Sequence, residues 1–382
     1  MRENETHGKS RIELVTKAIF LLPAFGIICS TALCSPSEKF LTFYGMSDAS
    51  AAVAVDAETF IVADDEDNLL RVYKISNNSC PVFSYDLTQF LGLAAEHPEA
   101  DIEGATMVGN RIYWITSHGR SREGEIRPNR YRFFATVVKT QDKLITIGTD
   151  GIPCKTLIHS LVKTDTICRA ELNRATLFDI ANLTKQQCNS LAPQKNGLNV
   201  EALCASPDGK TIYIGFRSPL FYDKLTSTAK AIVIPLNNAA EVVEGKGNGN
   251  KPAFGAPMLW DLQGCGIRSM EYSHYHKAYF IIASPTGEKN RFAIYRWSGK
   301  TYSPPEIVRQ IDSEEDLFNP EALLTFKDSP KLLLLSDDGN LKIDVSSSSE
   351  CMPSKSFKDG KCLNKHLKNK GKKSFRGMWL EP

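Results

Sequence analysis

From residue 40 onward, short apolar segments alternate with polar turns, and this unit recurs along most of the chain. Residues 51–55 and 59–62 flank the turn Asp56–Glu58, and residues 111–115 follow Gly109–Asn110, a strong hairpin signal. No helical periodicity of comparable length appears outside the N-terminal segment. The pattern therefore predicts an all-β protein made of short antiparallel strands.

A polar phrase opens the unit five times, with two polar side chains spaced two residues apart. The five pairs are Asp48/Ser50, Asp101/Glu103, Asn199/Glu201, Ser269/Glu271 and Asn319/Glu321. One supersecondary unit repeated in this way is typical of a β-propeller. The gap of 98 residues between Asp101 and Asn199 favours a further blade plus an insertion at about residues 140–195. We expect about six four-stranded blades, with five or seven as alternatives.

The two ends of the repeat region carry strand-like sequences. Residues 40–43 read Phe-Leu-Thr-Phe, and residues 375–379 read Phe-Arg-Gly-Met-Trp. Pairing of the last strand with the first would close the ring and remove an exposed sheet edge. We therefore expect one propeller domain over residues 35–382.

The N-terminal segment differs from the repeats. Residues 18–33 form a charge-free apolar run that follows several basic residues, and small residues precede Ser35. The run is short for a membrane span, so residues 1–34 are predicted to be a signal peptide. The expected location is periplasmic or secreted, and an uncleaved N-terminal membrane anchor is the alternative.

Cysteine content and charge narrow the picture further. Outside the predicted signal the chain has eight cysteines, an even number that is compatible with disulfides in an exported protein. Cys351 and Cys362 are the best local pair, and Cys154, Cys168 and Cys188 form a second group. The net charge of +2 gives no support for nucleic-acid binding. A monomer is expected.

Residues 346–373 form a Ser- and Lys-rich segment with eight lysines. One interpretation is a solvated insertion that the Cys351–Cys362 pair closes. The other is contact of this Lys-rich tail with an anionic surface, such as lipid headgroups or an envelope polysaccharide.

In a propeller, the innermost strands begin around one channel mouth, and side chains two apart share a face. The repeated phrases and the loops after the second strands should therefore meet there. The candidate catalytic residues are Glu103, His118, Glu201, Glu271 and Glu321. The candidate substrate-binding residues are Arg120, Arg130, Arg217 and Arg268, and the candidate metal ligands are Asp48, Asp64, Asp65 and Asp337.

Three interpretations of this mouth remain open. The glutamates could be structural, because buried charges must be paired and arginines lie nearby in the pattern. Carboxylates could instead bind a hard divalent cation, Ca²⁺ rather than Mg²⁺. In the third, a cation and arginines bind an anionic or ester substrate, while His118 or a glutamate transfers protons.

Several motifs together resemble a bacterial family, domain of unknown function 3616. They include Val62-Ala-Asp-Asp-Glu-Asp-Asn68, Glu99-Ala-Asp-Ile-Glu-Gly104, Tyr113-Trp-Ile-Thr-Ser-His-Gly-Arg120, Asn199-Val-Glu-Ala-Leu203 and Asn319-Pro-Glu-Ala-Leu323. The resemblance covers about residues 40–345 and brings no established activity. The blade motifs are also similar to those of esterase-like phytase propellers, which would imply phosphoester or ester hydrolysis at the mouth.

These observations lead to one functional hypothesis and one alternative. The hypothesis is a cation-assisted phosphoester or ester hydrolase. Its four arginines would bind the anion, its four glutamates would hold the cation or activate water, and His118 would act as acid or base. The alternative is a non-catalytic propeller scaffold that binds a partner or an anionic envelope polymer.

Overall fold

The structure is a computed structural model that describes residues 40–77, 80–141, 144–245, 251–287, 291–312 and 317–382. The predicted signal segment lies outside these residues. Among the helices of the described ranges, none is long and apolar enough to cross a bilayer.

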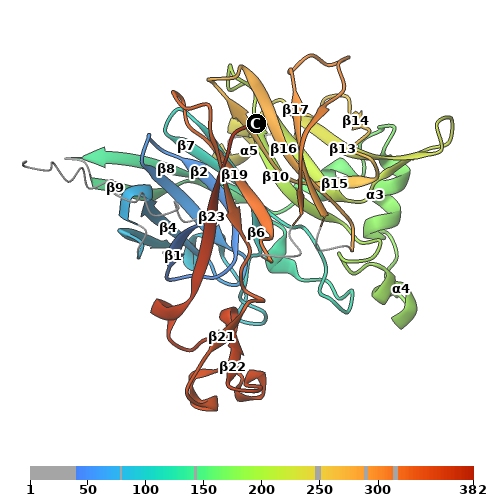
Figure 1. Ribbon diagram of the computed structural model, residues 1–382. Coiled ribbons are helices and arrows are strands. Elements are labelled where there is room, and N and C mark those ends of the chain that lie inside the picture. Colours follow the sequence, from blue (N-terminus) through green and yellow to red (C-terminus); the bar gives the residue numbers. More distant parts are fainter. Residues whose placement is uncertain (1–39, 78–79, 142–143, 246–250, 288–290, 313–316) are drawn as a thin grey trace, which may run out of the picture. The chain divides into compact units, whose positions relative to one another are not determined.

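Five four-stranded antiparallel blades make up the described domain (Figure 1). The first contains β2 (Ala49–Ala54), β3 (Thr59–Asp64), β4 (Leu69–Lys74) and β5 (Phe83–Asp86), and the second contains β6 (Ile102–Val108), β7 (Arg111–Thr116), β8 (Phe133–Gln141) and β9 (Leu144–Cys154). The third contains β10 (Asn199–Ala205), β11 (Ile212–Ser218), β13 (Thr228–Leu236) and β12 (Phe221–Asp223), with β14 (Met258–Trp260) also paired to β13. The fourth contains β15 (Cys265–Ser273), β16 (Ala278–Pro285), β17 (Arg291–Trp297) and β18 (Glu306–Asp312).

The fifth blade closes the ring, as the sequence predicted. It contains β19 (Pro320–Thr325), β20 (Leu332–Ser336), the C-terminal β23 (Ser374–Leu380) and the N-terminal β1 (Leu41–Tyr44). Leu41 pairs with Gly377 and Tyr44 with Ser374. The innermost strands β2, β6, β10, β15 and β19 contact one another in turn, and β19 contacts β2. The all-β propeller is confirmed.

Five blades is the lower end of the expected range. The long gap that favoured a sixth blade contains instead the extended β8–β9 hairpin and three helices, α2 (Leu157–Leu161), α3 (Arg169–Thr176) and α4 (Lys185–Ser190). Leu157, Leu161 and Leu172 are buried against the second and third blades. All three helices are too short to give a clear periodicity in the sequence. Two further short helices are α1 (Thr88–Leu91) and α5 (Ala239–Glu244).

Apolar layers between adjacent blades hold the ring together. Between the first two blades, for example, Ile61 and Val72 pack in one buried cluster with Trp114 and Phe134. Burial of aliphatic and aromatic side chains of this size stabilises each interface by roughly 1.5–3 kcal/mol per side chain. The interlocked blades therefore give the inner strands a fixed register.

Each innermost strand has a register shift at the same level of the ring, and one residue there has no partner on the second strand. The five bulged residues are Ser50, Glu103, Glu201, Arg268 and Glu321. β-bulges of this kind redirect a side chain away from the regular alternation. The fourth blade therefore places Arg268, and not Glu271, at the level of the other glutamates.

Residues 342–373 form a projection before the last strand, with the two-stranded sheet β21 (Lys342–Asp344) and β22 (Lys361–Leu363) (Figure 1). The Cys351–Cys362 disulfide that the sequence favoured is present, and both cysteines are buried with Leu367. The second group of cysteines, Cys154, Cys168 and Cys188, consists of free thiols.

Candidate functional site

The ends of the inner strands nearest the bulges open into a cavity of about 840 Å³, here called the mouth. Ten of the predicted site residues line it: Asp48, Asp65, Glu103, Arg120, Arg130, Glu201, Arg217, Arg268, Glu321 and Asp337. The strand geometry thus gathers side chains from all five blades, as expected. Asp64 lies directly beside this wall, whereas His118 and Glu271 do not line it.

One side of the mouth is strongly acidic. We call Asp48, Asp64, Asp65, Asp101 and Glu103 the acidic sector; they come from the first two blades and their loops. Carboxylate oxygens of Asp48, Asp64 and Asp65 lie within 4.8 Å of one another, and so do those of Asp65, Asp101 and Glu103. Asp65 belongs to both groups and joins them.

Burial and mutual repulsion oppose ionisation in the acidic sector. Burial raises the pKa of Asp64 to about 7, with the charge of Asp67 as the next cause. Burial also raises the pKa of Asp65 well above its usual range, followed by the charge of Glu103. The pKa values of Asp48 and Glu103 are raised well above normal for the same first reason. These groups would ionise together only with a compensating cation nearby.

Direct ion pairs supply only part of that compensation. Asp101 forms an ion pair with Arg130 at 3.1 Å, but Glu103 forms none with any residue in the described ranges. The buried Oδ1 of Asp65 accepts no hydrogen bond from a described residue. An all-oxygen donor set with an orphaned carboxylate oxygen fits a hard divalent cation.

A glycine in the loop after β20 makes room for one member of this sector. A Cβ atom at Gly339 would lie 1.8 Å from Asp48 Oδ1, far inside van der Waals contact. Ser47 Oγ donates to the other oxygen, Asp48 Oδ2, at 2.5 Å. The Asp48 carboxylate therefore lies against the backbone of Gly339, where a larger residue would not fit.

The opposite side of the mouth contains a buried ion-pair network. The Arg268 guanidinium lies between two glutamates: its Nε is 3.1 Å from Glu201 Oε2, and its Nη2 pairs with Glu321 Oε1. Arg217 Nη1 donates to Glu201 Oε1 at 2.9 Å. Arg268 and Glu201 are each about 5% exposed or less. This half of the ring matches the structural interpretation, with each glutamate paired.

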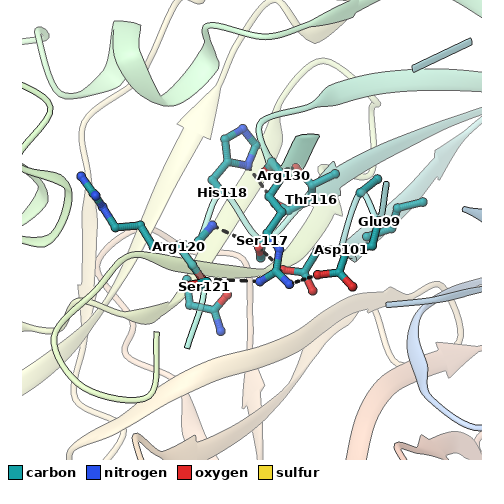
Figure 2. A network of polar contacts seen from close by, with 12 residues as sticks. Glu99, Asp101, Thr116, Ser117, His118, Arg120, Ser121 and Arg130 are labelled. Atoms are coloured by element: carbon teal, nitrogen blue, oxygen red, sulfur yellow. Dashed lines mark hydrogen bonds and ion pairs between the residues drawn. The ribbon is translucent and has the colours of Figure 1, made fainter. Parts of the chain in front are cut away.

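Arg130 occupies the mouth next to the acidic sector, and Figure 2 shows its guanidinium reaching toward Glu99 and Asp101. The partner Glu99 precedes the repeated phrase and was not among the predicted site residues. Asp101 also accepts a hydrogen bond from Ser117 Oγ. Arg130 is therefore positioned by carboxylates and still faces the cavity.

His118 lies behind the mouth wall and not in it. It is 1% exposed, its Nδ1 lies 2.8 Å from the carbonyl oxygen of Thr116, and its ring is directed away from Asp101 (Figure 2). Burial lowers the pKa of His118 to about 4, so the imidazole is neutral near pH 7. The expectation that His118 lies on the rim is wrong, because the tight loop after β7 turns the ring inward against Tyr131.

Two other predicted residues line the mouth but mainly stabilise the loops around it. Arg120 donates through Nη1 to the carbonyl of Gly124 and through Nη2 to that of Thr176, which ties its loop to α3. Asp337 accepts hydrogen bonds from Asn319 Nδ2 and the Gly339 amide. Both side chains therefore have protein partners already.

Glu271 is at the other end of the propeller channel, and its predicted place on this rim is wrong. It lies three residues beyond the bulge of β15 and pairs with Phe280. It lines a second cavity that shares no lining residue with the mouth. The error arose because the phrase Ser269-Met-Glu271 imitates the spacing of the other four copies.

The projection of residues 342–373 contributes part of the mouth wall, which the sequence did not predict. Leu363, Lys365 and His366 line the cavity. Lys365 Nζ donates to Glu66 Oε1 at 2.6 Å, and Lys370 pairs with Asp67 at 3.8 Å. Lys365 therefore contacts the first blade from within the mouth wall, whereas the Lys370 side chain is largely exposed.

Solved structures with a similar fold are distant in sequence. The chain is 11% identical to Kuenenia stuttgartiensis hydrazine synthase, covering 79% of this chain and 60% of that one, with a TM-score of 0.31. It is 11% identical to Myxococcus xanthus glutaminyl cyclase (77% and 88% covered, TM-score 0.38) and 8% identical to a Thermus thermophilus protein described as "putative oxidoreductase (glucose dehydrogenase)" (89% and 100%, TM-score 0.37). These scores carry no argument about activity, and no curated protein matches the sequence.

The family comparison is more specific, because its match spans most of the propeller. Residues 48–327 match the family described as "Protein of unknown function (DUF3616)". The matched range begins at Asp48 in the first repeated phrase and ends just beyond β19, so it includes all five bulged residues. The chain belongs to this family, DUF3616.

Proposed function

We propose that the mouth binds a divalent cation in the acidic sector and uses it to hydrolyse a phosphoester or another ester. The observation that carries the proposal is that two clusters of three carboxylates have Asp65 in common. Its Oδ1 has no hydrogen-bond donor among the described residues. Asp48, Asp64, Asp65, Asp101 and Glu103 would hold the ion. Oxygen-only ligands favour Ca²⁺ or Mg²⁺, and the irregular arrangement of the carboxylates favours Ca²⁺.

The charge balance of the mouth supports a cation over a simple anion. Ten acidic side chains line it: Asp48, Asp65, Glu66, Glu99, Asp101, Glu103, Glu123, Glu201, Glu321 and Asp337. The seven arginines and lysines are Arg120, Arg122, Arg127, Arg130, Arg217, Arg268 and Lys365. When all these groups are ionised, the acids exceed the bases by three, an excess that a bound divalent cation would offset.

The cation and the arginines of the mouth would have different roles in this reaction. A bound divalent cation polarises an ester oxygen and lowers the pKa of a coordinated water. Arg130 faces the same cavity and would orient the anionic part of the ligand from the side of Asp101. Arg217 and Arg268 are engaged by Glu201, and Arg268 also by Glu321, so they would keep the side of the mouth opposite the acidic sector close to neutral.

The activity is tested by turnover. The purified protein is given 4-nitrophenyl phosphate, bis(4-nitrophenyl) phosphate and 4-nitrophenyl acetate with Ca²⁺, Mg²⁺, Mn²⁺ or a chelator. We expect cation-dependent turnover that Asp65→Asn reduces at least 100-fold, since the shared ligand is lost. Asp165→Asn is the control, because the Asp165 side chain is 98% exposed on another part of the molecule.

Background rates for all three esters with every cation would refute the hydrolase. Binding of a cation without turnover would instead favour the non-catalytic propeller scaffold. We further propose export: the Cys351–Cys362 disulfide fits an oxidising compartment. The N-terminal sequence of the mature protein tests this, and a start near residue 35 is expected.

A further inference from the structure

A second cavity, of about 790 Å³, lies at the opposite end of the inner strands. Turns that connect the first and second strands of the blades form its walls, and all five blades contribute. The contributing stretches are residues 53–57, 106–109, 205–209, 271–272 with 274, and 325–329. We call this cavity the turn-side cavity; no function described above involves it.

Glu271 is the distinctive group in the turn-side cavity. It extends from the inner strand β15, deeper than the turns, and no residue in the described ranges forms an ion pair with it. A carboxylate in such a wall is unfavourable when it is charged and unpaired. Its chemistry is therefore complementary to a ligand that brings a positive charge.

The rest of the cavity supports the same kind of ligand. Its walls include the apolar side chains Val53, Met107, Phe326 and Trp379, and the Phe326 and Trp379 rings pack together 5.5 Å apart. The rim carries three carboxylates and one lysine: Asp56, Asp208, Asp328 and Lys327. A negative rim attracts cations, and aromatic faces bind ammonium groups favourably.

We propose that the turn-side cavity binds a small organic ammonium ion, with Glu271 as its counter-ion and the aromatic and aliphatic wall around its apolar body. The site is independent of the cation and of the hydrolysis proposed for the mouth. The two sites would also recognise their ligands differently. The turn-side cavity offers the single carboxyl group of Glu271 beside an apolar surface, whereas the mouth offers clustered carboxylates.

Proton release gives the proposal a direct signature. Burial raises the pKa of Glu271 to about 8, so the free carboxyl is mostly protonated at pH 7 and must ionise when the ammonium ion binds. The titratable or charged groups around it are Cys204 on β10, Tyr272 on its own strand, His274 in the turn that follows, Tyr279 on β16 and Lys327 after β19, together with the rim carboxylates Asp56, Asp208 and Asp328. Burial raises the pKa values of Cys204 and Tyr279, which leaves both neutral at pH 7.

The test is calorimetric titration of the full chain with phenethylammonium and with the neutral 2-phenylethanol at pH 7, in two buffers of different ionisation enthalpy. We expect the ammonium to bind at least tenfold more tightly than the alcohol. Binding should release on the order of one proton. Glu271→Gln should abolish both the preference and the release.

Glu58→Gln is the matched control, because Glu58 is exposed in a neighbouring turn and does not line the cavity. It should behave as the wild type. Equal affinities for ammonium and alcohol, absence of ammonium binding, or unchanged binding by Glu271→Gln would each overturn the proposal. Proton release and the comparison of the two ligands are measured on the wild type, so they decide the question even if Glu271→Gln misfolds.

Discussion

Arg268 and Glu201 occupy equivalent bulged positions on neighbouring inner strands, and the Arg268 Nε lies 3.1 Å from Glu201 Oε2. The fourth blade thereby supplies a positive charge at the level where its neighbours on both sides supply glutamates. This pairing neutralises one half of the mouth. The other half, the acidic sector of the first two blades, has no equivalent arginine at a bulge, because Ser50 is the first-blade counterpart.

Replacement of Arg268 tests whether this network is structural. Arg268→Met removes the arginine that pairs with Glu321 and one of the two arginines that pair with Glu201, so buried carboxylate charge is left uncompensated. We expect the free energy of unfolding to fall by about 3 kcal/mol in a denaturant titration. Arg127→Met, which breaks a pair with the more exposed Glu125, should change it by less than about 1 kcal/mol. A loss for Arg268→Met no larger than that of the control would show that the network does not stabilise the fold.

Stability should depend on pH in a direction set by the acidic sector. Asp64 has a folded-state pKa of about 7, above its ordinary value of 3.8. The folded chain therefore holds more protons than the unfolded chain between these values, and stability contributed by Asp64 is lost as the pH rises through about 7. In cation-free buffer, the melting temperature of the wild type should fall more between pH 5 and pH 8 than that of Asp64→Asn. The account fails on this point if the two proteins have the same pH profile.

Gly339 should be required for the position of Asp48. A methyl group at residue 339 would collide with Asp48 Oδ1, so Gly339→Ala must displace this carboxylate. We expect at least a tenfold weaker Ca²⁺ affinity, measured by titration calorimetry, because one ligand of the first carboxylate group moves. Gly148→Ala is a suitable comparison, since its Cβ would meet only Val137 Cγ1 at an ordinary 3.6 Å. Equal affinities for the two variants would remove Asp48 from the site.

The disulfide should hold the projection of residues 342–373 against the mouth. Cys351, Cys362 and Leu367 are the only fully buried apolar residues in that small cluster of the described chain. The variant Cys351→Ala/Cys362→Ala should therefore raise hydrogen exchange in this segment while the inner strands stay protected. Mass-resolved exchange on both proteins measures the effect. Unchanged protection of residues 361–367 would mean that the contacts of Lys365 and Asn364 suffice without the disulfide.

The propeller could be predicted from the sequence because its signals are short and local: hairpin turns and a repeated polar phrase recur in each blade. It also predicted ring closure through residues 40–43 and 375–379, which pair as expected. Helices α2–α4 escaped prediction because each is short, and α2 and α3 bury their apolar side chains against the blades. The blade count was therefore overestimated within the stated range.

For the mouth, sequence spacing succeeded where strand register is uniform and failed at β15. Glu103, Glu201 and Glu321 follow an apolar residue and precede a small one, and so does Arg268 between Ile267 and Ser269. Glu271 precedes Tyr272 and breaks this rule. The small residue after the bulge was thus a better guide than the glutamate itself. The inward turn of His118 had no comparable signal, because it depends on packing against Tyr131 from a distant part of the loop.

The central claim is that the acidic sector binds a divalent cation through Asp65, and titration calorimetry with Ca²⁺ at pH 8 tests it most directly. The wild type and Asp165→Asn should bind Ca²⁺ with equal affinity, and Asp65→Asn should bind at least tenfold more weakly, because Asp65 is shared by both carboxylate groups. Affinity should also fall as the pH is lowered below about 7, where Asp64 becomes protonated. No Ca²⁺ binding by the wild type, or equal binding by Asp65→Asn, would contradict the account.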